Sequence, residues 1–202
     1  RAGMPAQYRG YTFGVIESDD PVAFSTPGGF IWVGTGMIDL CETEDELAAV
    51  MAHEIGHAKN LHAIHQFDAQ RGGVEFAEGL KAFLAGDPAL YIVEAADDLL
   101  NLSDAIADAV FNNDYSEEFE FEADREAINL MATAGYDVKA MVDVLDKVRT
   151  IIEQGEDVGA YLEGHPDVNI RISKAKQQIR NHGYKGQTNQ TRTKRFMYYF
   201  GG

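Results

Sequence analysis

Cysteine is almost absent from this sequence of 202 residues, which contains only Cys41. A single cysteine excludes an internal disulfide and a cysteine-rich zinc site. We expect Cys41 to be a small residue packed near the start of a helix rather than a nucleophile. The sequence also lacks an apolar run of about 18 or more residues, so it predicts no ordinary transmembrane helix. It contains no signal peptide and opens at Arg1 without an initiator methionine, so we expect a chain trimmed at its amino terminus.

Basic residues are also few. The chain has 17 lysines and arginines against 33 aspartates and glutamates, and its formal net charge is −16. This charge disfavours nucleic acid and anionic membrane surfaces as general partners. Hydrophobic residues make up 45% of the chain and charged residues 25%, which are ordinary globular values. The length predicts one domain, residues 1–202, that can bury a sizeable core.

The stretch 48–62, AAVMAHEIGHAKNLH, contains a His-Glu-x-x-His pattern at His53, Glu54 and His57. On a helix, residues four apart lie on one face, so the two histidines can bind one ion. Zinc binds imidazole nitrogens, and a catalytic zinc keeps one position open for a water whose proton a neighbouring carboxylate can take. The pattern therefore predicts a zinc hydrolase with Glu54 as general base.

The alternative for this stretch is an amphipathic helix with two solvent-exposed histidines. Apolar residues on most sides of the helix argue against it, because they predict a buried helix. Buried histidines need partners, and a metal ion supplies one. Thr43 and Glu46 form a capping-box pattern that predicts where the helix begins.

Two histidines are too few for a catalytic zinc, which usually takes three protein ligands. A metzincin would place a third histidine at position 63, but that residue is Ala63, and His62 falls one residue short. The other histidines, His65, His165 and His182, are possible ligands without any spacing that favours them.

The remaining route is a carboxylate from a second helix, in the segment 117–127, EEFEFEADREA. Glu120 and Asp124 are four residues apart on one face, and Ala123 and Ala127 beside them allow close helix approach. We expect Glu120 to ligate zinc and Asp124 to accept the ring N–H of a ligand histidine. The alternative is a solvated acidic helix face, which we expect for Glu117, Glu118 and Glu122.

The rest of the pattern predicts an α+β protein that is mainly α. Strands are expected at 11–17, 22–25 and 30–33, in a small, mostly antiparallel sheet. Helices are expected at 74–84, 89–111, 116–135, 138–154 and 168–181, followed by a tail that is polar, then basic and finally aromatic. The span 73–111 is a helical insertion, for which we consider packing on the catalytic domain, a lid and a docking element.

The motif HEIGH followed by Glu120-x-x-Ala123-Asp124 resembles the gluzincin zinc endopeptidases of the HtpX, BepA and CAAX prenyl-protease family, the M-forty-eight metallopeptidases. The resemblance covers about residues 13–172 and includes Ala23-Phe24, Pro27-Gly28-Gly29-Phe30, Glu46-Leu47-Ala48-Ala49-Val50, His62, Ala134-Gly135-Tyr136-Asp137, and His165-Pro166 with Arg171. The chain departs from the family at Val22, where asparagine is common, and at Glu117, where arginine is common.

The resemblance implies a gluzincin-like domain with an active-site helix and a glutamate helix, one zinc ion per chain and protein or peptide substrates. It implies cleavage of misfolded or membrane-associated proteins and an extracytoplasmic location, in the bacterial periplasm or at a membrane. His165 and Arg171 are candidates for stabilising the oxyanion. His165 is also a candidate for an inhibitory zinc ligand on a mobile loop. We expect the substrate to add as a strand along Phe30, Ile31, Trp32, Val33 and Gly34.

Two other functions are compatible with these residues. The chain could be a zinc-holding, proteolytically latent chaperone-like or assembly module, which would keep His53, His57 and Glu120 but not depend on Glu54. It could also be a metal-free helical interaction domain. Metal content separates the last function from the other two, and dependence on Glu54 separates the enzyme from the latent module.

Overall fold

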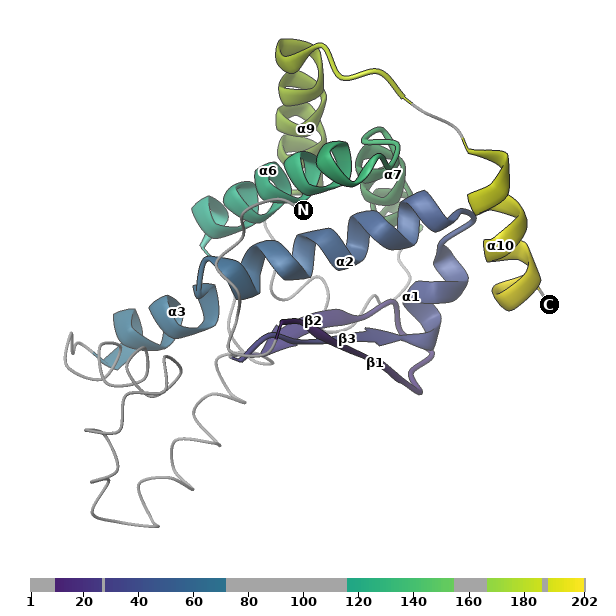
Figure 1. The fold of residues 1–202 in the computed structure, drawn as a ribbon. Coiled ribbons are helices and arrows are strands. Elements are labelled where there is room, and N and C mark those ends of the chain that lie inside the picture. Colours follow the sequence, from purple (N-terminus) through teal and green to yellow (C-terminus); the bar gives the residue numbers. More distant parts are fainter. Residues whose placement is uncertain (1–9, 27, 72–115, 155–166, 187–188, 202) are drawn as a thin grey trace.

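The computed structural model describes residues 10–26, 28–71, 116–154, 167–186 and 189–201 (Figure 1). The expected helices at 74–84 and 89–111, and the insertion 73–111 as a whole, lie outside the described residues, as does His165. Among the described helices, none has both the length and the hydropathy of a membrane-spanning segment.

The sheet has three strands, β1 (Thr12–Ile16), β2 (Ala23–Thr26) and β3 (Phe30–Gly34), in the order β1-β3-β2. β2 pairs antiparallel with β3, and β1 pairs parallel with β3. Gly28 and Gly29 make the turn between β2 and β3 with φ angles of 98° and 85°, which side chains other than glycine rarely adopt. The sheet is therefore mixed rather than mostly antiparallel.

The central position of β3 contradicts the prediction that Phe30–Gly34 is a free edge for the substrate. β1 and β2 occupy its two sides, so its backbone groups are already paired. Ile31 and Val33 are 0% and 4% exposed, and the Trp32 ring lies over Gly14 of β1, where a side chain would clash with it. The apolar run that predicted a strand thus reflects a strand buried at the middle of the sheet.

Three helices follow the sheet: α1 (Thr35–Leu40), α2 (Glu44–Lys59) and α3 (His62–Arg71). The Thr43 side-chain oxygen accepts a hydrogen bond from the Glu46 N–H at 3.1 Å, so the predicted cap begins α2. The Glu46 carboxylate instead accepts from the Glu42 N–H at 2.5 Å. Leu61, with a φ of 55°, turns the chain sharply between α2 and α3.

The remaining described helices are α6 (Glu117–Ala134), α7 (Ala140–Glu153), α9 (Val168–His182) and α10 (Gln190–Phe200). Ser116 caps α6 at its start, and Gly135 ends it with a φ of 80°. In the region of α10, the sequence pattern indicated only a tail that is polar, then basic and finally aromatic, and it predicted no helix there. Asn189 caps this helix by accepting from the backbone N–H groups of Thr191 and Arg192, and that capping residue was the available signal for it.

Helix α2 runs through the middle of the molecule, with the sheet on one side and α6, α7 and α9 on the other (Figure 1). Buried apolar side chains from α1, α2, α6, α7, α9 and the sheet form one core. Its largest fully buried members include Met37, Ile128, Met131, Leu145 and Val148. This arrangement confirms an α+β fold that is mainly α, and it explains why the His-Glu-x-x-His helix is buried on most sides.

Candidate metal centre

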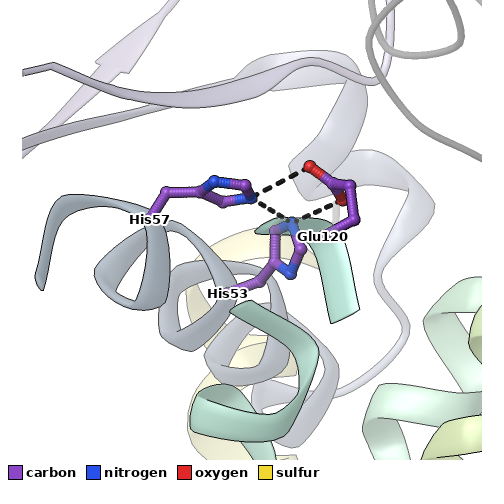
Figure 2. A group of neighbouring side chains, drawn as sticks. All are labelled: His53, His57 and Glu120. Atoms are coloured by element: carbon purple, nitrogen blue, oxygen red, sulfur yellow. Dashed lines mark hydrogen bonds and ion pairs between the residues drawn. The ribbon is translucent and has the colours of Figure 1, made fainter. Parts of the chain in front are cut away.

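Three side chains from two helices meet in the interior. His53 and His57 extend from α2, and Glu120 extends toward them from α6 (Figure 2). The two Nε2 atoms lie 3.0 Å apart. Glu120 Oε1 lies 3.1 Å from His57 Nε2, and Oε2 lies 3.4 Å from His53 Nε2. Within the described part of the chain, these residues are the group whose ligand atoms are close enough to share a metal ion.

The separations fit a tetrahedral metal. Ligand atoms about 2.0–2.2 Å from a tetrahedral zinc lie about 3.3–3.6 Å from one another, and the three measured distances are within about 0.3 Å of that range. Two imidazole nitrogens and one carboxylate are a donor set of catalytic zinc sites. All three residues are at most 3% exposed, so a divalent cation bound by them would be shielded from bulk water by the protein.

Close contact between α2 and α6 brings Glu120 to the histidines. A Cβ atom at Gly56 would lie 3.0 Å from the Cα and carbonyl oxygen of Ala123, so glycine is the residue that permits this approach. Ala123 and Ala127 are both 0% exposed and present only methyl groups to the contact. Small residues on both helices thus set the distance between the histidines and the carboxylate.

Asp124 lies one turn after Glu120 and contacts His53 from the other side of its ring. Asp124 Oδ1 is 2.9 Å from His53 Nδ1, which leaves Nε2 directed at Glu120 and His57. This is the geometry expected for a carboxylate that selects the tautomer of a ligand histidine. Burial favours the neutral carboxyl group, but the Arg171 guanidinium outweighs it and lowers the pKa of Asp124 to about 2.

The acidic surroundings also act on His53. Burial of the ring opposes protonation, but the charge of Glu120 and the hydrogen bond with Asp124 outweigh it and raise the pKa of His53 to about 9. In the absence of a metal, this imidazole is therefore protonated on both ring nitrogens, and so positively charged, at neutral pH. A cation entering the centre replaces that proton and meets the same negative groups.

Arg171, on α9, is 1% exposed and lies behind the centre. Its Nε and Nη2 donate to the two Asp124 oxygens at 2.9 and 2.7 Å, and Nη1 lies 3.1 Å from Glu120 Oε2. A guanidinium directed at two carboxylates of α6 is placed to hold them in position. This geometry favours a positioning role for Arg171 over the expected role as oxyanion partner.

The other sequence-predicted residues are placed as follows. Glu54 follows His53 on α2 and is 3% exposed. His65 is exposed on α3, and His182 ends α9, with its Nδ1 3.0 Å from the Gln178 carbonyl oxygen. Cys41 is buried, and burial raises the pKa of its thiol to about 12, which fits a packed residue rather than a nucleophile.

His62 was considered as a third metal ligand and as part of the family resemblance, and the structure places it beside His57 rather than at the metal centre. Its Nδ1 lies 3.0 Å from Nδ1 of His57, the ring nitrogen that faces away from Glu120. Its Nε2 lies 3.4 Å from Glu122 Oε2. The sequence signal for this contact was weak, because the contact joins residues of α3 and α6 that lie 60 positions apart.

Comparison with known proteins adds an independent observation. Metalloendopeptidase OMA1 of Schizosaccharomyces pombe, described as mitochondrial, is 28% identical over 178 residues, which are 86% of this chain and 48% of the relative. OMA1 of Arabidopsis thaliana is 30% identical over 162 residues, 78% of this chain and 30% of the relative. The beta-barrel assembly-enhancing protease of Yersinia pestis is 26% identical over 167 residues, which are 82% of this chain and 34% of the relative.

The chain thus spans about a third to a half of the length of these curated relatives. The model of Peptidase family M48 matches residues 1–179, a range that contains all three residues of the metal centre. The match covers most of the chain, as the resemblance in the motifs predicted. This protein belongs to peptidase family M48.

Proposed function

We propose that this protein is a zinc-dependent endopeptidase that hydrolyses peptide bonds of protein substrates. The observation that carries the proposal is the convergence of His53 Nε2, His57 Nε2 and the Glu120 carboxylate inside the fold. The names of the relatives, metalloendopeptidase and protease, support the same reaction. No observation in the described residues favours the alternative of a latent, chaperone-like module.

His53, His57 and Glu120 would hold the zinc ion. When bound, zinc polarises the scissile carbonyl and lowers the pKa of a water towards about 7. The Glu54 carboxylate takes a proton from the attacking water and later delivers it to the nitrogen of the leaving amine. Asp124 keeps the His53 proton on Nδ1, so that Nε2 remains a ligand. His165 keeps both of its predicted roles, as oxyanion partner or as inhibitory ligand, as hypotheses.

Strand β2 replaces β3 as the proposed site of substrate pairing. β2 lies at an edge of the described sheet, antiparallel to β3, and α2 packs against it. A peptide that adds to an exposed strand edge is held by main-chain hydrogen bonds, which position it with little regard to its sequence. β2 is therefore better placed than β3 to bring an extended substrate to the helix that bears Glu54.

The decisive experiment compares Glu54→Gln with the unaltered protein. General acid–base catalysis contributes about 10²–10⁴-fold, so we expect cleavage of a casein-type substrate to fall by that factor while the zinc content stays at about one ion per chain. Glu118→Gln, at an exposed position of α6, is the matched control and retains activity. Normal cleavage by Glu54→Gln would remove the proposal.

Metal identity has its own test. We expect elemental analysis to find about one zinc per chain, a chelator to abolish cleavage, and added zinc to restore it. A purified protein that cleaves without metal, or that binds no zinc, contradicts the proposal. An extracytoplasmic location stays a prediction from the resemblance, which fractionation of the producing cells would check.

A further inference from the structure

We propose that His62 is a positioning residue for the metal ligand His57, and that Glu122 holds His62 in place. The proposal rests on the proposed metal site and adds residues to it that the His-Glu-x-x-His and glutamate motifs do not contain. It accounts for a buried histidine of α3 and an acidic residue of α6 that are otherwise unused.

The geometry is a row of three side chains that leads away from the metal centre. His57 Nε2 faces Glu120 at 3.1 Å, and its other nitrogen, Nδ1, lies 3.0 Å from His62 Nδ1. His62 Nε2 then lies 3.4 Å from Glu122 Oε2. His62 is 1% exposed, whereas the Glu122 side chain is 38% exposed, so the row begins in the interior and ends at the surface.

The placement of protons follows from the chemistry of imidazole. A neutral ring that offers Nε2 to a metal carries its proton on Nδ1, so His57 must donate from Nδ1. The acceptor at 3.0 Å is His62 Nδ1, which therefore carries no proton. The proton of a neutral His62 then resides on Nε2, the nitrogen directed at the Glu122 carboxylate. A single arrangement of protons, with His57 protonated on Nδ1 and His62 on Nε2, therefore gives every contact in the row one donor and one acceptor.

An aromatic contact fixes the His62 ring. It stacks on Phe119, with centroids 4.5 Å apart and planes inclined by 6°. Phe119 and Glu122 are three residues apart on α6 and so share a face. One face of α6 thus supports His62, while Glu120 and Asp124 serve the metal centre.

The two metal-binding histidines would then be oriented in different ways. His53 meets a carboxylate directly, through Asp124. His57 Nδ1 instead meets a second imidazole, His62, which in turn faces the Glu122 carboxylate. Partners of ligand histidines fix the ring orientation, and their loss typically weakens metal binding by about 10–100-fold.

The test measures zinc affinity by competition with a chelator, in the Glu54→Gln background so that proteolysis does not interfere. His62→Phe keeps the aromatic stacking but removes the acceptor, and we expect zinc affinity to fall by about 10–100-fold. His62→Gln, whose amide oxygen can accept, should recover part of the loss. His65→Phe, at an exposed position of the same helix, is the control and should not change affinity. Equal affinity in His62→Phe and the parent protein would overturn the proposal.

A second measurement does not depend on a variant that folds. Nitrogen NMR of the zinc-loaded protein should show His57 with its proton on Nδ1 and His62 with its proton on Nε2. A His62 proton on Nδ1 overturns the proposal. If the parent protein binds no zinc, the proposed function itself fails. If the parent binds zinc and the His62 variants bind it equally well, only the positioning role fails.

Discussion

Both histidines of the metal centre have a partner at the ring nitrogen that faces away from Glu120. For His53 that partner is Asp124, an anion that also receives two hydrogen bonds from Arg171. The carboxylates raise the pKa of His53, so metal binding at neutral pH must displace a proton. We therefore expect Asp124 to affect metal affinity through both the orientation and the charge of the His53 ring.

Replacement of Asp124 by asparagine tests this double role. The asparagine amide would retain a carbonyl acceptor but lose the charge opposite the buried Arg171 guanidinium. We expect Asp124→Asn to weaken zinc binding by about 10–100-fold and to lower the free energy of unfolding by about 3–5 kcal/mol, because it removes one of the two carboxylates that pair with the buried Arg171 cation. Chelator competition and urea unfolding measure the two effects.

Asp39→Asn is the control for this substitution, since Asp39 is exposed on α1. It should leave both quantities within experimental error. An Asp124→Asn protein with the zinc affinity and stability of the parent would show that Asp124 does not orient His53.

The contact between α2 and α6 decides whether the three ligands meet. Gly56 on α2 faces the backbone of Ala123 on α6, three residues after Glu120. A backbone atom cannot rotate away from a new side chain, so any substitution at Gly56 must move one helix relative to the other. The spacing of the two helices thus belongs to the chemistry of the centre as well as to the packing of the core.

A valine at position 56 should widen that contact. We expect Gly56→Val to destabilise the fold by about 1–3 kcal/mol through overpacking and to weaken zinc binding, because Glu120 moves away from the histidines. Thermal unfolding and chelator competition give the two values. Ala134→Val, at an exposed position near the end of α6, introduces the same side chain without a facing helix and should retain zinc affinity.

At the scale of the whole molecule, helix α10 contacts both the beginning of α2 and the end of α6. Arg192 pairs with Asp45 at 2.9 Å and donates to the Gly135 carbonyl oxygen at 2.9 Å. Arg195 pairs with Glu44. The family model ends at residue 179, so this helix lies beyond the matched range. Its contacts connect the two helices that carry the metal ligands, although it is remote from the centre in sequence.

The Glu44–Arg195 pair makes part of this contact dependent on pH. The hydrogen bond from Arg195 is the largest influence on Glu44 and lowers the pKa of its carboxyl group. A lowered folded-state pKa contributes stability that is present above the ordinary carboxyl pKa and is lost as the pH falls through the folded-state value. We expect Glu44→Gln to lower the melting temperature by about 1–3 °C at pH 7, and the difference to shrink below about pH 4.

Melting curves of both proteins between pH 3 and pH 8 check this prediction. Glu118→Gln, which removes a charge from an exposed position of α6, serves as the control. A difference in melting temperature that stays constant across the range would mean that the ion pair contributes nothing to the docking of α10.

Local features of the sequence determined much of this protein. The four-residue spacing of His53 and His57, and of Glu120 and Asp124, places each pair on one helical face whatever surrounds it. Helix caps at Thr43 and Ser116 act within one turn, so they too could be predicted. These short-range rules were enough to predict a mainly α fold and three candidate metal ligands, and the resemblance of the motifs predicted the family.

Only the tertiary structure decided the features that join distant parts of the chain. Strand sequences do not specify which strand lies in the middle of the sheet, and the expected substrate edge at Phe30–Gly34 was wrong for that reason. The contacts of His62 with Glu122, and of Arg171 with Asp124, join residues 60 and 47 positions apart. Such contacts follow from how the helices pack around α2, and packing depends on the whole set of buried side chains rather than on any one segment.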